Sequence, residues 1–286
     1  MSSLRELVAE ELSLPVDARA AAMAKAIAQK HGSASRAVLF YGSCLRQKQL
    51  DGLMLDFYLI VSNYRAAYGK GWLAAANRLI PPNVFYFEHA GLAAKYAVLS
   101  EIDFNRLNGP DTSSVSVWAR FAQPSRLIWA SNDAVRDRAI DAVSRAAPTL
   151  LAAAGPKPGE QALDLWRRAF ALTYSAELRA ERKGRAASVV DLEPARYERF
   201  SAPALKMAQT LRPVGTWAGR RFEGKVLSIL RLAKASFTFA GGADYIAWKI
   251  NRHAGTKIAL KPWQRRHPLL AAITLLPRLL SSGAVR

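Results

Sequence analysis

Residues 41–61 read YGSCLRQKQLDGLMLDFYLIV, and they place a Gly-Ser turn a short distance ahead of an apolar run that carries one aspartate. The segments on either side of the turn, Arg36–Tyr41 and Leu53–Val61, are rich in Val, Leu, Phe and Tyr, which is typical of strands. In a pleated strand Asp56 lies on the same face as Tyr58. An acid in that setting needs a strong partner, so Asp56 is either a metal ligand or a buried acid paired with a cation.

The first half of the chain predicts a mixed α/β domain. Ser3 and Glu6 form a capping box ahead of a first helix, and Asp17 caps a second one. Residues 69–80 also follow a helical pattern. Three further strands are predicted at Asn83–Phe87, Ala94–Leu99 and Arg126–Ala130.

The second half predicts mostly helix. From Asp133 the pattern is helical through Ala153, breaks at the sequence GPKPGE and is helical again from Gln161 through Arg182. A domain boundary is therefore expected between residues 131 and 160. The predicted organisation is an α/β domain at 1–132, a helical domain at 133–258 and a basic, Leu-rich tail at 259–286.

Composition narrows the class of protein. The chain has 286 residues and is 51% hydrophobic, which is enough for a folded protein with sizeable cores. Its one cysteine, Cys44, excludes an intrachain disulfide and a thiolate-rich zinc site and suits a reducing cytoplasm. The first 32 residues are charged and helix-periodic, so they do not predict a secretory signal.

The formal net charge of +19 is unevenly distributed. Up to residue 150 there are 17 Lys and Arg against 13 Asp and Glu, whereas from Lys206 onward there are 15 against 2. A polycationic C-terminal third predicts a phosphate-rich partner, either nucleic acid or an anionic membrane surface. Charge alone does not choose between them.

The tail from Leu260 to Arg286 sets a basic, Trp-containing lead before the apolar run Leu269–Leu276. That run is too short to span a bilayer, which takes roughly 20 apolar residues as a helix. It could lie in the membrane interface, with Trp263 at headgroup depth and nearby Lys and Arg on anionic lipid. The alternative is a terminal helix that docks on its own domain.

The Gly-Ser turn and the aspartate suit nucleotidyl transfer. That reaction needs a turn whose backbone holds a triphosphate, and carboxylates that hold magnesium where the α-phosphate meets the nucleophile. Gly42 and Ser43 would hold the phosphates, and Asp56 would bind Mg²⁺. The arrangement resembles the DNA polymerase β-like nucleotidyltransferase superfamily, but Met54 occupies the place of the first of its two acids. Candidates for a second carboxylate are Asp51, just upstream, and Glu88, Glu101 and Asp103.

A longer succession of motifs resembles one family. This family is the mitochondrial translocator-maintenance type of phosphatidate cytidylyltransferase, a peripheral CDP-diacylglycerol synthase with bacterial relatives. It tends to have a similar string around Asp56 in place of paired acids. The resemblance covers about residues 38–130 and 165–200. Its motifs are, in order, YGS at 41–43, MLDF at 54–57, VFYF at 84–87, KYAVLS at 95–100, ARFAQP at 119–124, LTYSAELR at 172–179 and VVDLEPARYERF at 189–200.

This resemblance implies a fold, a reaction and a location. The fold is a nucleotidyltransferase domain with a mixed sheet, followed by a winged-helix-like helical domain and a C-terminal amphipathic helix that contacts the membrane. The reaction uses Mg²⁺ and converts CTP and phosphatidic acid to CDP-diacylglycerol and pyrophosphate for phospholipid biosynthesis. The enzyme would be cytoplasmic and peripheral on the inner face of the cell membrane.

The resemblance also assigns roles outside the opening motif. Lys95 matches the family's Lys-Tyr pair and would bind the triphosphate or the phosphatidate phosphate; the alternative is an edge-strand lysine that keeps other strands away. Arg120 is a candidate for a bidentate phosphate contact, or else a surface arginine. Tyr174, Ser175, Glu177 and Arg179 match the family's motif and would line the cleft wall. On a helix Ser175 and Arg179 would share one face, and Tyr174 and Glu177 would share another. For that helix the simpler alternative is surface ion pairing of its charged residues.

Two other functions compete with this interpretation. The first is a nucleotidyltransferase with another acceptor such as RNA, for which Trp248, Lys249 and Trp263 interleave aromatic and basic groups. The second is a non-catalytic, membrane-associated scaffold that kept the fold and lost the metal site, as Met54 suggests.

Overall fold

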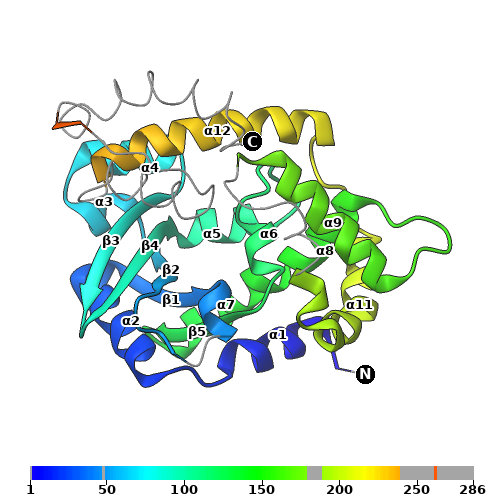
Figure 1. Cartoon of the computed structure of the whole chain (residues 1–286), viewed down its shortest axis with the longest axis horizontal. Coiled ribbons are helices and arrows are strands. Elements are labelled where there is room, and N and C mark those ends of the chain that lie inside the picture. Colours follow the sequence, from blue (N-terminus) through cyan, green and yellow to red (C-terminus); the bar gives the residue numbers. More distant parts are fainter. Residues whose placement is uncertain (1, 47–48, 179–188, 239–260, 263–286) are drawn as a thin grey trace.

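A computed structural model describes residues 2–46, 49–178, 189–238 and 261–262. Its centre is one five-stranded sheet with the strand order β3-β4-β2-β1-β5 (Figure 1). Strands β2 and β4 are parallel, and the other three neighbouring pairs are antiparallel. The predicted mixed α/β class and all five predicted strands are thereby confirmed. The strands are β1 (Ser35–Tyr41), β2 (Met54–Val61), β3 (Asn83–His89), β4 (Leu92–Ser100) and β5 (Ser125–Ala130).

One face of the sheet packs on α2 (Ala18–Lys30) and on the short helices that follow β2. These are α3 (Tyr64–Tyr68) and α4 (Gly71–Leu79), which matches the helix predicted at 69–80. The alternation of the strands explains this core, because Phe40 and Phe57 stack with ring centroids 4.9 Å apart on this face. Asp56 therefore points to the other face.

That other face is covered by most of the remaining helices, and a single apolar cluster runs from the first helix to the helices of the second half. The two predicted domains thus share one continuous core. Within 131–178 and 189–238 the regular elements are all helices, and the winged-helix detail stays a prediction. The helices of this face are α1 (Leu4–Ser13), α5 (Glu101–Asn108), α6 (Trp118–Phe121), α7 (Asp133–Ser144), α8 (Ala146–Ala154), α9 (Ala162–Ala176) and α11 (Pro194–Ala208).

The helix α1 begins with the predicted capping box, in which Ser3 and Glu6 bond each other's backbone. It joins the second half of the chain through a buried ion pair, since Arg196 of α11 bonds the carboxylate of Glu11 with both Nε and Nη2. The side chains of this pair are only 10% and 9% exposed. The N-terminal helix is thereby fixed to the helical half of the molecule.

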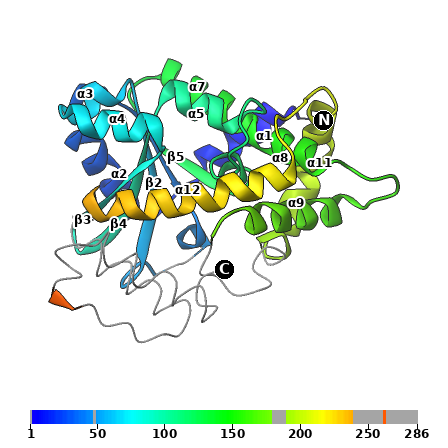
Figure 2. The same ribbon diagram turned by 90° about the horizontal axis from the view of Figure 1, so that it is seen from above.

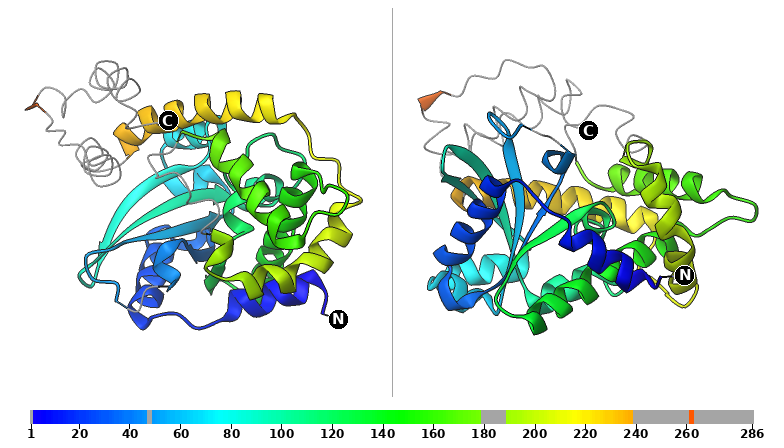
Figure 3. Two further views of the ribbon diagram at one scale, coloured as in Figure 1. Left: turned by 45° about the vertical axis from the view of Figure 1, so that its right-hand side comes forward. Right: turned by 90° about the horizontal axis from the view of Figure 1, so that it is seen from below.

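The long helix α12 (Trp217–Thr238) runs across the molecule from the helical half to the β3 edge of the sheet (Figures 2 and 3). It approaches the end of α9 closely, because a Cβ at Gly224 would lie 2.2 Å from the carbonyl oxygen of Ala176. Ser228 Oγ then accepts from the amide of Leu178 at 3.3 Å. At the sheet edge, Arg231 and Lys234 donate to backbone carbonyls of residues 80–82.

Two predictions about the second half need revision or lie beyond the described residues. The helix predicted from Gln161 through Arg182 is too long: α9 ends at Ala176, and Glu177 has extended backbone angles of φ −112° and ψ 154°. The physical reason is the close approach of α12 at that point. The predicted tail at 259–286 lies outside the described residues except for Lys261 and Pro262.

Candidate functional site

A row of polar side chains crosses the sheet at Asp56. In the register of the four strand pairs, Tyr86, Lys95, Asp56, Tyr41 and Ser125 are direct neighbours, one from each strand. Side chains that are paired in this way lie on the same face of a sheet. The row therefore faces the helical half of the molecule, with Asp56 at its centre.

Asp56 has a cationic partner. Its Oδ1 lies 3.0 Å from Nζ of Lys95, and the two side chains are 19% and 23% exposed. The contact has the distance of an ion pair but not the geometry of a hydrogen bond, and Oδ1 accepts no hydrogen bond from the residues that the structure describes. Asp56 is thus a paired acid that remains partly accessible, and Lys95 is not the lysine of a free sheet edge, because β4 lies between β2 and β3.

The predicted turn lies directly against this aspartate. Gly42 has φ +91°, and a Cβ there would lie 3.2 Å from Asp56 Oδ2. A side chain would be strained by the backbone and would press on the carboxylate, so both observations require glycine. Ser43 begins a short 3₁₀ turn, Ser43–Arg46, and its side chain is exposed. The structure therefore places Gly42 directly against Asp56, and the phosphate-binding roles of Gly42 and Ser43 stay predictions.

Arg120 reaches the same face from the short helix α6, and it is partly buried rather than a surface arginine. Its guanidinium lies 4.8 Å from the ring centroid of Tyr41, a cation–π contact, and its Nε has no hydrogen-bond partner among the described residues. Burial alone would lower the pKa of Arg120, but Tyr41, Tyr58 and the carboxylates of Asp56 and Glu177 outweigh it and raise the pKa. The guanidinium therefore stays charged in this partly buried position, close enough to Asp56 for the two charges to interact.

The two tyrosines of this face stay protonated. Burial raises the pKa of Tyr41, and the negative charge of Asp56 raises it further. Burial likewise raises the pKa of Tyr58, against the opposing effect of Arg120. Their ring centroids are 5.2 Å apart, so the two rings form one aromatic surface next to Asp56 and Arg120.

Near Arg120 the predicted cleft residue Glu177 forms an ion pair with a partner that local sequence patterns did not predict. Arg231 of α12 has Nη1 3.6 Å from Glu177 Oε1, with side chains 20% and 11% exposed. Burial lowers the pKa of Arg231, and Glu177 opposes that effect. The partner of Glu177 is thus 54 positions away in the sequence, and only the i, i+4, i+7 spacing of Gly224, Ser228 and Arg231 on one helix signals it.

The other residues predicted for the cleft wall are placed less centrally. Tyr174 is partly buried against the core of the helical half, and Ser175 is exposed and donates to Leu172 O of its own helix. Arg179 lies outside the described residues. Because α9 ends at Ala176, the predicted sharing of a helical face by Ser175 and Arg179 does not apply.

The structure does not bring Asp51 to Asp56. Asp51 Oδ1 accepts from Arg19 Nη1 at 2.9 Å, and Arg19 belongs to α2 on the opposite face of the sheet. The other candidate carboxylates are also bonded elsewhere: Glu88 accepts from Tyr86, Glu101 pairs with Arg138, and Asp103 accepts from Tyr64. Among the described residues, no three His, Cys, Asp or Glu side chains are grouped so that they could hold a metal.

No protein-family model matches the chain, and no curated protein sequence matches it. A function for the chain is therefore inferred from the geometry of the site. That geometry is one partly accessible carboxylate, a lysine paired with it, an arginine whose charge interacts with it and a glycine turn against it.

Proposed function

We propose that the protein is a nucleotidyltransferase of the polymerase β-like fold, and specifically a Mg²⁺-dependent CTP:phosphatidate cytidylyltransferase that makes CDP-diacylglycerol for phospholipid biosynthesis. One observation carries the proposal: Asp56, Lys95 and Arg120 converge on one sheet face beside the turn at Gly42. A nucleoside triphosphate needs this combination of cations, a close backbone turn and a metal-binding carboxylate.

The two cations suit a triphosphate. Lys95 and Arg120 leave the site with more positive than negative charge, and Arg120 has a donor, Nε, without a described acceptor. When a triphosphate enters, Lys95 exchanges the carboxylate of Asp56 for a phosphate oxygen. Gly42 and Ser43 contact the phosphates through the turn. Asp56 is then free to bind the cation that accompanies the nucleotide.

The residues present fit magnesium that arrives with its substrate. Mg²⁺ commonly takes only one or two carboxylates from the protein and completes its shell with water and substrate phosphates. Asp56 is the residue that would hold it, with an oxygen that accepts no described hydrogen bond. Asp51 is not positioned to help. When bound, the ion would neutralise charge on the phosphates and favour attack at the α-phosphorus.

The chemical step needs no strong base. A phosphate oxygen of phosphatidic acid forms a bond to the α-phosphorus of CTP, the bond from that phosphorus to the bridging oxygen breaks, and pyrophosphate leaves. The attacking oxygen is already ionised. His31 bonds Ala67 O and the hydroxyl of Tyr96 on the opposite face of the sheet, so it is not placed to act at Asp56.

A lipid substrate requires contact with a membrane, and α12 offers a surface for it. No described helix is long and apolar enough to cross a membrane. On α12, however, Phe222 is 75% exposed, and it shares an outward stripe with exposed Val226, Ile229 and Leu230. Arg221 and Lys225 flank this stripe and are exposed as well. The composition is that of a helix that lies in an anionic membrane interface, on the cytoplasmic side of the cell membrane.

The activity is tested by pyrophosphate release from the purified protein with Mg²⁺. CTP is compared with ATP, GTP and UTP, each with and without phosphatidic acid vesicles. Release that needs both CTP and phosphatidic acid is expected, and Asp56→Asn should abolish it without changing the circular dichroism spectrum. Release that persists in Asp56→Asn would remove Asp56 from the mechanism, and nucleotide incorporation into added RNA in place of lipid would reassign the acceptor.

A second candidate function has one observation in its favour. Asp56 is already paired with Lys95, and no other carboxylate joins it in the described part of the chain, as expected if the metal site has been lost. The protein would then be a non-catalytic, membrane-associated scaffold. Absence of CTP binding and of pyrophosphate release with every nucleotide, in a protein that still sediments with anionic vesicles, would favour this function.

Membrane docking is tested separately from activity. The double variant Phe222→Asp/Ile229→Asp should lose sedimentation with anionic vesicles, because it places two carboxylates in the outward stripe of α12. Ile102→Asp is the matched control, since Ile102 is 77% exposed on α5, away from α12. Equal sedimentation of the two proteins would contradict the docking surface.

A further inference from the structure

A pocket lies between α3 and α4, at the opposite end of β2 from Asp56. Its volume is about 450 Å³, within the range of small-molecule sites. Asn63, which lines it, follows Asp56 by seven positions, so at about 3.3 Å per residue the two sites are roughly 20 Å apart. The pocket is therefore distinct from the candidate nucleotide site.

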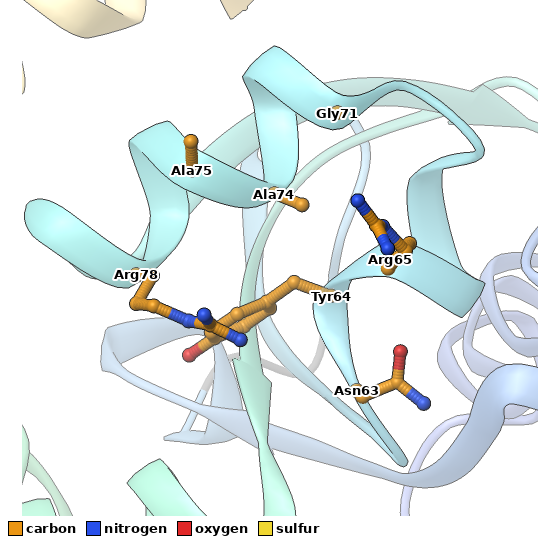
Figure 4. Close-up of a pocket in the computed structure, with 7 residues that line it drawn as sticks. All are labelled: Asn63, Tyr64, Arg65, Gly71, Ala74, Ala75 and Arg78. Carbon is orange, nitrogen blue, oxygen red and sulfur yellow. The ribbon is translucent and has the colours of Figure 1, made fainter.

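The pocket is hollow because one wall is made of small residues. Gly71, Ala74 and Ala75 occupy the side of α4 that faces it, and Arg78 ends the same stripe at i, i+3, i+4 and i+7 (Figure 4). The chain turns sharply before this wall at Gly69, whose φ of +61° ends α3. Two short helices joined by a glycine thus enclose a space that their side chains do not fill.

The opposite wall is held rigidly. Tyr64 lines the pocket, is almost fully buried and donates its hydroxyl to Asp103 Oδ2 at 2.5 Å. Asn63 caps α3 by accepting from the amide of Ala66 at 2.8 Å. The tyrosine ring and the alanine wall provide apolar surface for the organic part of a ligand.

The charged residues that line the pocket are both positive. Arg65 from α3 and Arg78 from α4 are among its lining residues, and none of the lining residues is acidic (Figure 4). Within the described parts of the chain, neither guanidinium has a carboxylate within ion-pair distance. The side chain of Lys70, the N-cap of α4, makes no capping hydrogen bond. Two guanidinium groups beside an apolar wall suit a small organic ligand that carries a phosphate group.

We propose that this pocket binds a small phosphorylated molecule, with Arg65 and Arg78 on the phosphate and Tyr64, Ala74 and Ala75 against its organic part. The phosphate could belong to a soluble metabolite or to a lipid headgroup. Trp72 and Leu79, which are 54% and 77% exposed on α4, would favour the lipid, because they could enter the membrane beside the pocket.

The test uses the full-length protein labelled with ¹⁵N-arginine and two probes, inorganic phosphate and glycerol 3-phosphate. The guanidinium Nε–H signals of Arg65 and Arg78 are assigned with Arg65→Lys and Arg78→Lys. Both signals should shift in a saturable way with one common Kd, and glycerol 3-phosphate should bind more tightly. Each single alanine variant should weaken binding at this site at least about tenfold, as expected for loss of a charge-assisted hydrogen bond.

The matched control is Lys25→Ala/Lys157→Ala, which removes the same two charges as Arg65→Ala/Arg78→Ala from exposed positions away from the pocket. The control should leave the Kd unchanged. Equal weakening by the control, or no saturable shift of either arginine signal, would overturn the proposal. Because the signals belong to Arg65 and Arg78 themselves, phosphate that binds at Lys95 and Arg120 does not affect the result.

The source of the phosphate is decided by a second arm. Sedimentation with phosphatidic acid vesicles is compared between the wild type and Arg65→Ala/Arg78→Ala. Loss in the variant, with the Lys25→Ala/Lys157→Ala control unaffected, assigns the pocket to a lipid headgroup. Equal sedimentation, together with the arginine shifts, assigns it to a soluble phosphate ester. Either result is independent of whether the protein transfers a nucleotide.

Discussion

The contact between α12 and the end of α9 makes a quantitative prediction for Gly224→Ala. A Cβ at this position would lie 2.2 Å from Ala176 O and 3.0 Å from its carbonyl carbon, and these backbone atoms cannot rotate away. The helix must therefore move outward by about an ångström, which costs about 1–3 kcal/mol by analogy with overpacked cores. The shift also weakens the bond from Leu178 to Ser228, a loss of about 1 kcal/mol.

The same helix supplies the control. Gly219→Ala adds a Cβ that would lie 3.6 Å from Thr216 Oγ1, an ordinary contact. Replacing glycine by alanine in a helix gains up to about 1 kcal/mol in the free energy of unfolding. We expect Gly219→Ala to be neutral or stabilising and Gly224→Ala to be destabilising by about 1–3 kcal/mol, since the helical gain offsets part of the cost.

Urea unfolding followed by circular dichroism measures the difference between these two variants. About 1–4 kcal/mol should separate their free energies of unfolding, and each kcal/mol corresponds to roughly 2–4 °C of Tm in a protein of this size. Equal stabilisation by both substitutions would refute the reasoning, because it would show that α12 does not approach α9 as closely as Gly224 implies. Gly224→Ala should also separate Arg231 from Glu177 and so reduce nucleotide binding.

Three further substitutions test other parts of the structure. Arg196→Ala should lower the free energy of unfolding by about 3–5 kcal/mol, measured by heat or urea, because it leaves Glu11 buried and unpaired. The double variant Glu11→Leu/Arg196→Leu should lose much less stability. Equal losses in the two variants would contradict the buried ion pair. Gly42→Ala should lower the free energy of unfolding by about 1–3 kcal/mol and also weaken CTP binding. Gly52 has φ +71° and no atom near its Cβ position, so Gly52→Ala should lower stability without changing CTP binding. Burial and the charge of Arg231 lower the pKa of Lys234 from 10.5 to about 7. Between these two pH values the unfolded state binds one proton more than the folded state, so the stability of the wild type relative to Lys234→Met should rise with pH from about 7 to 10. A stability difference that does not change with pH would refute the lowered pKa.

The sheet could be predicted from the sequence because its signals are local. Alternation of apolar residues and the Gly-Ser turn located the strands to within one or two residues, and the capping box of the first helix is present as predicted. The turn and Asp56 are adjacent because a short connection joins their strands. Such features need only the neighbouring residues, which fixes them before any tertiary packing is known.

The partners within the site could not be predicted in the same way. Lys95 pairs with Asp56 because β2 and β4 are parallel neighbours, although β3 and two helices separate them in the sequence. Asp51 is closer in the sequence to Asp56 but is turned to the other face by Arg19. The length of α9 was overestimated for a related reason, since its end is set by a glycine on α12 and not by a stop signal of its own.

The two faces of α12 connect the proposed membrane surface to the proposed nucleotide site. Gly224, Ser228 and Arg231 face α9 and Glu177, and the carboxylate of Glu177 in turn stabilises the charge of Arg120. The outward face carries the exposed stripe that begins at Phe222. A membrane that fixes this stripe also fixes the position of Arg231, because a helix moves as one rigid element. Binding to anionic lipid should therefore order the environment of Arg120, and the affinity for CTP should be higher on phosphatidic acid vesicles than in solution even when turnover is prevented by Asp56→Asn.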